Sequence, residues 1–220
     1  MQQASVIGQS QLRDEEIIER IKEGEKSLYE LIVRRYNPRL FRISMAIVKD
    51  ENEAEENMQA AYVKAYEKLD QFQGKSSFAT WLTRILINES LISLKRSERN
   101  YLMSGDSEPQ QTILLNMTRI ENKTPEHEVL NNELRVVLEN AVMNLPEKYR
   151  MVYMLREVEK LSVEETGSLL DITHSNVKVI LNRAKSMLRK NISEQYEETE
   201  VFAFHLNRCD RIVDHVMSRI

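Results

Sequence analysis

Apolar side chains recur every three or four residues along most of this 220-residue chain. This spacing places them on one face of an α-helix, whereas a half-buried strand would alternate at every second residue. Only five glycines and four prolines interrupt the pattern, so the helices can be long. The sequence therefore predicts an all-α protein with two helical domains joined by a flexible linker.

Changes in composition predict where these domains begin and end. The polar stretch after the first domain contains Gly105, Pro109 and Pro125, which is typical of a linker. From the N-terminus we expect a tail, a helical domain, the linker, a second helical domain and an extension, at residues 1–13, 14–97, 98–126, 127–192 and 193–220.

The first domain contains several linked helices. We expect a break near Gly24 and a new helix starting at Asn37-Pro38, because proline suits a first helical turn. A loop over residues 71–77 precedes the last helix, which Ser76 or Ser77 can cap. The predicted buried stripe of that helix is Phe78, Leu82, Ile85 and Ile92.

Several classes of protein are excluded. The single cysteine, Cys209, allows no intramolecular disulfide, and pairing it with His205 does not complete a metal site. No apolar run could span a bilayer and no signal peptide is evident, so we expect a cytoplasmic protein without membrane insertion. Because no phosphate loop or nucleophile–base set occurs, we expect no enzyme activity, cofactor, metal or small-molecule substrate.

The stretch LSVEETGSLLDITHSNVKVILNRAKSMLRK has the pattern of a helix-turn-helix. Ser162 and Glu165 match a capping box at the start of a short helix. Asp171 follows this helix, and aspartate tolerates the left-handed backbone of a tight turn. A second, longer helix then begins, capped by Thr173 or Ser175.

This second helix carries five cationic side chains and no acidic one, although the chain has a net charge of −4. Its apolar positions share one face, and the opposite face carries small polar residues flanked by cations. That arrangement suits a DNA major groove, with the polar groups at base edges and the cations at phosphates. The alternative is a solvated helix of a bundle, whose surface would normally mix both signs of charge. The predicted DNA contacts are Ser175, Asn176, Lys178, Val179, Asn182, Arg183 and Lys185.

Two blocks of the chain resemble bacterial sigma factors of the sigma-70 family. Residues 39–96 resemble region 2 of that family, and residues 145–190 resemble region 4. The short linker and the lack of a region 3 domain are similar to the extracytoplasmic-function (ECF) class. The resemblance implies a transcription initiation factor that binds core RNA polymerase, reads the −35 promoter element with region 4 and opens the −10 element with region 2. It also implies an anti-sigma factor as a further partner.

The resemblance assigns roles within the first block. Polymerase docking falls on the helix EAEENMQAAYVKAYEKLDQF, at Glu55, Glu56 and Gln59, although Ala60 stands where the family usually has an acid. The segment QFQGKSSFATWLTRILINE matches the −10 and melting segment, where aromatic rings and cations can hold unstacked bases. For Phe78 we favour a place in the core. The −10 residues are Trp81, Arg84, Asn88, Lys95, Arg96 and Arg99.

The second block departs from the family at two positions. Ile180 replaces a usual arginine, and we expect it to pack at the edge of the core. Gly167 replaces a common alanine, at a cost of up to ~1 kcal/mol in helix propensity. The alternative function is a stand-alone helix-turn-helix regulator that binds duplex DNA as a dimer, although no dimerisation heptad supports it. The apolar side chains expected to dock the extension onto a domain are Phe202, Phe204, Leu206, Ile212, Val213 and Val216.

Overall fold

The computed structural model describes residues 12–104, 135–196 and 217, and every regular element within them is a helix. The predicted all-α fold is therefore confirmed. The first domain contains α2 (Asp14–Lys22), the 3₁₀ turn η1 (Lys26–Leu28), α3 (Tyr29–Val48), α4 (Glu51–Glu67), the 3₁₀ turn η2 (Leu69–Gln71) and α5 (Phe78–Ser104). The second contains helical residues 135–143, α7 (Glu147–Tyr153), the π-helical turn η3 (Met154–Val158), α8 (Val163–Leu170) and α9 (His174–Tyr196).

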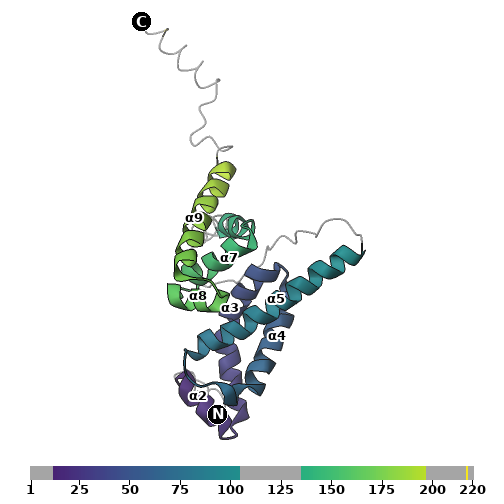
Figure 1. Ribbon diagram of the computed structural model, residues 1–220, viewed down its shortest axis with the longest axis vertical. Helices are drawn as coiled ribbons and strands as arrows, with labels where there is room; N and C mark the ends of the chain where they lie inside the picture. Colours follow the sequence, from purple (N-terminus) through teal and green to yellow (C-terminus); the bar gives the residue numbers. More distant parts are fainter. Residues whose placement is uncertain (1–11, 105–134, 197–216, 218–220) are drawn as a thin grey trace.

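In the first domain, α3, α4 and α5 pack against one another, and α2 lies at one end of this bundle (Figure 1). The chain turns between α2 and η1 at Gly24, whose φ of 113° favours glycine. The predicted break near Gly24 is therefore confirmed. One face of α4 is buried, and its apolar members recur at helical spacing, at Ala54, Met58, Ala61 and Ala65.

The predicted helix start at Asn37-Pro38 is wrong, because α3 continues through both residues. Proline inside a helix removes one backbone hydrogen bond and costs about 3 kcal/mol. Ile32 and Tyr36 before the proline are buried in the same core as Leu40 after it. This shared packing stabilises both halves of α3 as one element.

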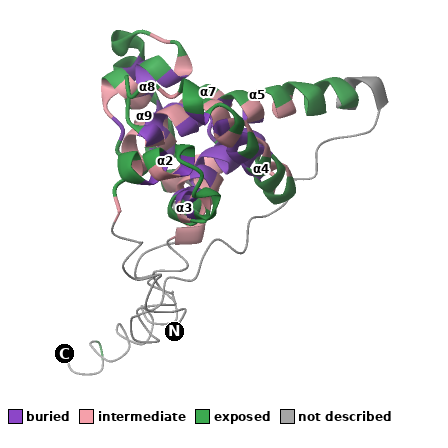
Figure 2. Cartoon of the chain, turned by 90° about the horizontal axis from the view of Figure 1, so that it is seen from below, coloured by how far each residue is buried: buried purple, intermediate pink, exposed green. Residues whose placement is uncertain are grey.

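Two predictions for α5 are also wrong. The helix continues through Ser104, so its last turns occupy part of the predicted linker; the rest of that linker and residues 127–134 lie outside the described residues. Ile92 is 61% exposed rather than buried. Ile92 lies on the outer side of α5, whereas its neighbours Leu91 and Leu94 pack against the core. Only the last turns of α5 extend away from the bundle (Figure 2).

The second domain contains the predicted helix-turn-helix, formed by α8 and α9. The Ser162 hydroxyl accepts a hydrogen bond from the Glu165 N–H at 3.0 Å, and the Glu165 carboxylate accepts one from the Ser162 N–H at 2.8 Å. Asp171 has the expected positive φ, 53°. Thr173, rather than Ser175, caps α9, because its hydroxyl accepts from the Asn176 N–H at 3.3 Å.

Gly167 has a packing role that its low helix propensity does not reveal. It is buried where α8 passes the turn that leads into α9. A Cβ atom at this position would lie 2.8 Å from the Ile172 carbonyl oxygen and 3.2 Å from the His174 ring. The absence of a side chain therefore allows the two helices of the motif to approach closely.

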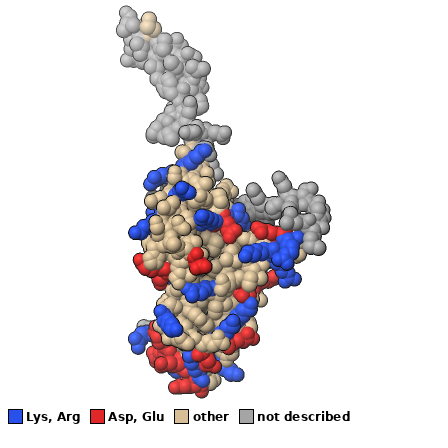
Figure 3. Space-filling view, in the orientation of Figure 1, with Lys and Arg blue, Asp and Glu red and all other residues tan. Residues whose placement is uncertain are grey.

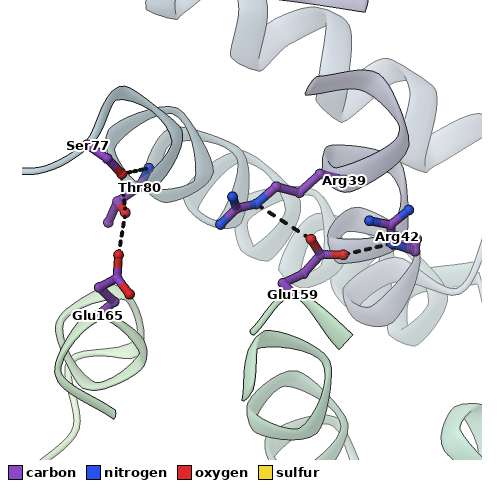
Figure 4. A network of polar contacts seen from close by, with 6 residues as sticks. All are labelled: Arg39, Arg42, Ser77, Thr80, Glu159 and Glu165. Atoms are coloured by element: carbon purple, nitrogen blue, oxygen red, sulfur yellow. Dashed lines mark hydrogen bonds and ion pairs between the residues drawn. The ribbon is translucent and has the colours of Figure 1, made fainter. Parts of the chain in front are cut away.

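The two domains pack directly against each other, with α7 and α8 on α3 and α5 (Figure 1). Polar contacts from both domains close the interface (Figure 4). Arg42 of α3 donates to the Glu159 carboxylate at 2.7 Å, and the Nε atom of Arg39 lies 3.6 Å from the same carboxylate, which is only 5% exposed. Thr80, at the start of α5, donates to the Glu165 carboxylate at 3.1 Å.

A buried arginine reinforces this interface. Arg150 of α7 donates to the carbonyl groups of Ala46 and Ile47 at the end of α3. Its guanidinium also donates to the carbonyl groups of Met143 and Leu145, at 3.1 and 2.7 Å, after helical residues 135–143. A cation is stabilised at such positions, because the last carbonyl groups of a helix carry partial negative charge.

Candidate nucleic-acid interface

One face of α5 carries a row of side chains that stay at least partly exposed to solvent. Their spacing of three or four residues keeps them within about 80° of one another around the helix axis. Ile92 belongs to this row, although its apolar side chain led sequence reasoning to place it in the core. The row consists of Trp81, Arg84, Asn88, Ile92, Lys95 and Arg99, and the exposed Arg96 lies beside it. The structure therefore brings the predicted −10 residues onto one surface.

Trp81 lies at the start of this row and packs against two phenylalanine rings. Its ring centroid lies 5.3 Å from that of Phe72 and 5.6 Å from that of Phe78. Phe78 is buried, as we expected, whereas Trp81 keeps part of its surface exposed. A ring held in this way is suited to stacking against an unpaired base.

The recognition helix α9 presents the predicted DNA-contacting face to solvent. Its buried face contains Val177, Ile180, Ala184 and Leu188. Ile180, which replaces a usual arginine, is thus part of the core, and one cation is absent from the surface. Val179 is 44% exposed near the middle of the outer face. The other exposed predicted residues are Ser175, Asn176, Lys178, Asn182 and Arg183.

Lys185 differs from the other predicted contacts on α9. Its ammonium group lies 2.7 Å from the carboxylate of Glu157, in η3. The hydrogen bond from Lys185 lowers the pKa of Glu157, so the carboxylate stays charged at neutral pH. This pairing offsets the positive charge of Lys185 at the edge of the recognition face.

Charges on the surface are segregated (Figure 3). Lysine and arginine gather along α9 and over the far end of α5, whereas acidic side chains gather around α2. The basic areas coincide with the two helices that carry the predicted DNA contacts. This distribution explains how a chain of net charge −4 can present basic surfaces.

Arg84 links the α5 row to the helix-turn-helix of the second domain. Its guanidinium donates to the hydroxyl of Ser168 at 2.5 Å and to the carbonyl of the same residue at 3.2 Å. Ser168 lies on α8, so the helix-turn-helix packs beside the first turns of the α5 row, while Arg84 itself stays exposed. Spacing along the sequence contains no signal for this contact.

A separate exposed face lies on α4. Glu55, Glu56 and Gln59, the predicted polymerase-docking residues, are all exposed there. Val63 follows one turn later on the same face and is 59% exposed. Sequence reasoning missed Val63, although its position four residues after Gln59 on the same helix is the signal that could have identified it.

Other kinds of site find no support in the part of the chain that the structure describes. None of its helices is long and apolar enough to cross a membrane. Within residues 12–104 and 135–196, no cluster of three or more potential metal ligands occurs. His205 and Cys209 lie outside the described residues.

Comparison with known proteins decides the family. Residues 32–100 match the family model of sigma-70 region 2, and residues 135–188 match that of sigma-70 region 4. An ECF RNA polymerase sigma-E factor from Haemophilus influenzae is 31% identical over 191 residues, which cover 83% of this chain and 96% of the relative. The chain belongs to the ECF class of the sigma-70 family.

Further relatives and solved structures agree with this assignment. The ECF sigma factor SigW of Bacillus subtilis is 26% identical over 80% of this chain and 95% of its own length. The sigma factor RpoE of Bartonella quintana, solved with the anti-sigma factor NepR, shares the fold with a TM-score of 0.63 at 18% identity, over 75% of this chain and 96% of that one. CnrH, solved with the cytosolic domain of CnrY, gives a TM-score of 0.54 at 19% identity, over 84% and 97%. The α5 row thus lies in region 2, and α8 and α9 lie in region 4.

Proposed function

We propose that this chain is a transcription initiation factor that directs core RNA polymerase to specific promoters in the cytoplasm. The observation that carries the proposal is the pairing of two exposed, basic helix faces with the two matched regions. In this proposal residues 14–97 act as region 2 and residues 127–192 as region 4. The chemistry of RNA synthesis belongs to the polymerase, and this chain supplies recognition.

In region 4, α9 enters the major groove at the −35 element. Lys178 and Arg183 lie on either side of an outer face whose polar groups belong to Ser175 and Asn182. Val179 offers an apolar surface at the centre of this face, which suits contact with a thymine methyl group. The base preferences of this helix therefore depend on residues other than the arginine that Ile180 replaces.

In region 2, the α5 row binds the −10 element and holds it open. Trp81 stacks on an unpaired base, and Asn88 offers hydrogen bonds to a base edge. Lys95, Arg96 and Arg99 bind the phosphates of the same strand, which lies along α5.

Partners of region 2 and of the whole chain follow from the same proposal. The α4 face of Glu55, Glu56, Gln59 and Val63 docks on core polymerase, with carboxylates toward a basic surface and Val63 in an apolar contact. The sigma factor RpoE of Bartonella quintana was solved in complex with the anti-sigma factor NepR, and CnrH was solved with the cytosolic domain of CnrY. We extend an anti-sigma partner to this chain on that basis.

The proposed function requires the two domains to separate. In the closed arrangement Ser168 of region 4 accepts hydrogen bonds from the Nη2 group of Arg84, so region 4 competes with promoter DNA for this cation. The −10 and −35 elements are also distinct sites that regions 2 and 4 must reach at the same time. Binding to core polymerase therefore has to replace the closed interface with contacts to each domain.

Reconstituted transcription tests the proposal. The purified chain, added to core polymerase, should start run-off transcripts at specific promoters. Replacing Arg183 by alanine should keep polymerase binding, weaken −35 binding and reduce the slope of its salt dependence by about 1, in line with the loss of one phosphate contact. Arg34→Ala, which removes an exposed arginine paired with Glu30 on α3, is the matched control and should leave transcription unchanged.

Three results would contradict the proposal. A chain that never binds core polymerase is not a sigma factor. Tight binding of a DNA site by the chain alone, with no effect of added polymerase, would favour the stand-alone regulator. Binding should also weaken steeply as salt rises, because phosphate contacts release counterions, and a flat response would exclude a DNA-binding role.

A further inference from the structure

An apolar groove of about 610 Å³ lies between the two domains. One wall comes from α3 of region 2, and the others come from residues 135–143, η3 and α9 of region 4. Phe41, Met45 and Met154 contribute to its surface. Leu138 and Val158 also line it and are 43% and 40% exposed, which is high for large apolar side chains. Exposed apolar surface of this kind marks a place where another element binds.

The helix α9 leads the chain to this groove. Leu188 and Ile192 of α9 line the groove, and the helix ends about one turn later, at Tyr196. Residues 197–220 follow. The first four of these, Glu-Glu-Thr-Glu, can span about 13 Å when extended, which is enough for the chain to turn back toward the groove.

The remaining segment, residues 201–220, has the pattern of an amphipathic helix. Apolar side chains share one side of a helical wheel, at Leu206, Cys209, Val213, Val216, Met217 and Ile220. Asp210 and Asp214 border one edge of this stripe, and Arg208 and Arg219 border the other. Of this segment the structure describes Met217, which is 62% exposed.

We propose that residues 201–220 bind in this groove as a helix and hold regions 2 and 4 together. The groove and the segment each present apolar surface, and α9 places them next to each other. A helix over residues 206–220 would be about 22 Å long, enough to cross a groove bounded by helices that pack 8–10 Å apart. The lining also carries charges of both signs, at Arg42, Arg189, Glu139 and Glu157, and a segment bordered by both aspartate and arginine suits such a rim. Three of these groups already form ion pairs in the closed protein, so the apolar contact carries the proposal.

Docking in this groove would couple the extension to the arrangement of the domains. The walls come from both regions, so the groove exists only while the domains are closed. The bound segment would add its buried apolar area to the interface that Arg150 and Glu159 already stabilise. This inference does not depend on DNA or polymerase binding, so it can fail while the proposed function holds.

The single cysteine of the chain provides a direct test. Cys209 lies on the apolar stripe of the segment, so a second cysteine in the groove can form a disulfide with it. With Leu138→Cys, mild oxidation should give an intramolecular disulfide roughly 10-fold faster than with Val63→Cys, because docking raises the effective concentration of the two thiols. Val63 is the matched control, since it is 59% exposed on α4, away from the groove.

A third variant and a measurement on the natural chain complete the experiment. Adding Val213→Asp and Val216→Asp to Leu138→Cys should reduce the disulfide rate to that of the control. In the unmodified chain, alkylation of Cys209 by a maleimide should be slower than in the chain with both aspartates. Circular dichroism shows whether each variant remains folded.

Three outcomes would overturn the proposal. Equal disulfide rates for Leu138→Cys and Val63→Cys would mean that the segment does not favour the groove. Disulfide-linked dimers, formed only with Leu138→Cys, would assign the groove to the segment of a second copy. Equal alkylation rates of Cys209 with and without the aspartates would mean that the segment does not bind in the groove, and that the apolar groove is a site for a different protein.

Discussion

Gly167 shows how a single position can differ from its family for a structural reason. Replacing it by alanine should gain up to ~1 kcal/mol of helix propensity. The new Cβ atom would meet the Ile172 carbonyl oxygen at 2.8 Å, and a backbone atom cannot rotate away. Overpacking costs about 1–3 kcal/mol, so we expect a net loss of stability in thermal or urea unfolding.

The control for this substitution is Ser186→Ala, which changes an exposed position on α9. It should raise stability slightly through helix propensity alone. Equal stabilisation by both substitutions would show that α8 and α9 have room for a methyl group. Sequence analysis identified Gly167 as unusual but could not explain it, because the atoms it approaches belong to the turn and to α9.

Val63 is an apolar residue whose exposure on α4 indicates a role in docking on core polymerase. Replacing it by serine should leave the stability of α4 nearly unchanged, since the side chain is 59% exposed. We expect affinity for core polymerase to fall several-fold, because an apolar contact at the docking face is lost. Binding can be measured by fluorescence anisotropy, with Ile92→Ser as a control that removes an exposed apolar side chain from α5. Equal affinities for the original chain and Val63→Ser would remove Val63 from the docking face.

At the recognition helix α9, Glu157 neutralises the positive charge of Lys185 and so lowers the positive charge of the proposed DNA-binding face. Glu157→Gln would keep the shape of the side chain and remove its negative charge. We expect tighter binding of duplex DNA and a steeper salt dependence, because Lys185 becomes available to a phosphate. The measurement is DNA affinity across a series of salt concentrations.

Glu25→Gln is the control for this substitution. It removes the carboxylate of another exposed ion pair, with Arg20 at 2.6 Å, far from α9 along the chain. If both variants strengthen DNA binding equally, the effect comes from the net charge of the protein and not from Lys185.

Because of the capping box of α8, the unfolding free energy of the protein should depend on pH. Hydrogen bonding from the Ser162 N–H lowers the pKa of Glu165 below its ordinary value. The stabilisation is therefore complete above the unfolded value of about 4.3 and is lost as the pH falls through the lower folded value. Between pH 5 and 3, we expect the original chain to lose more unfolding free energy than Glu165→Gln, as measured by urea titration. Equal losses would exclude this contribution.

These helices differ in how far the sequence predicts them. The caps of α8 were predicted correctly and the cap of α9 was narrowed to Thr173 or Ser175, because these side chains act on neighbouring backbone groups. The exposure of Ile92 on α5 and the continuity of α3 through Pro38 were not predicted. Both depend on which other helices cover an element, and apolar spacing alone does not contain that information.

The closed arrangement of the two domains was beyond sequence analysis for the same reason. Arg42 and Glu159 are 117 positions apart, and each would suit a solvated surface by residue type. Arg150 likewise donates hydrogen bonds to backbone carbonyl groups of both domains. Every residue has such a carbonyl group, so the sequence does not indicate which ones Arg150 will contact. The predicted DNA residues could be found from their helices, but the contact of Arg84 with region 4 required the packed structure.

The closed interface should open when its central carboxylate is neutralised. In Glu159→Gln, Arg42 would lose a charge-assisted hydrogen bond, which contributes about 1.5–3 kcal/mol, and Arg39 would lose its nearby negative charge. We expect the separated form to become more populated, with a larger radius of gyration in small-angle X-ray scattering. Glu25→Gln should leave the radius unchanged. Because opening frees Arg84 from Ser168, Glu159→Gln should also bind single-stranded −10 DNA more tightly without polymerase; unchanged affinity in a visibly opened protein would show that the closed form does not block this surface.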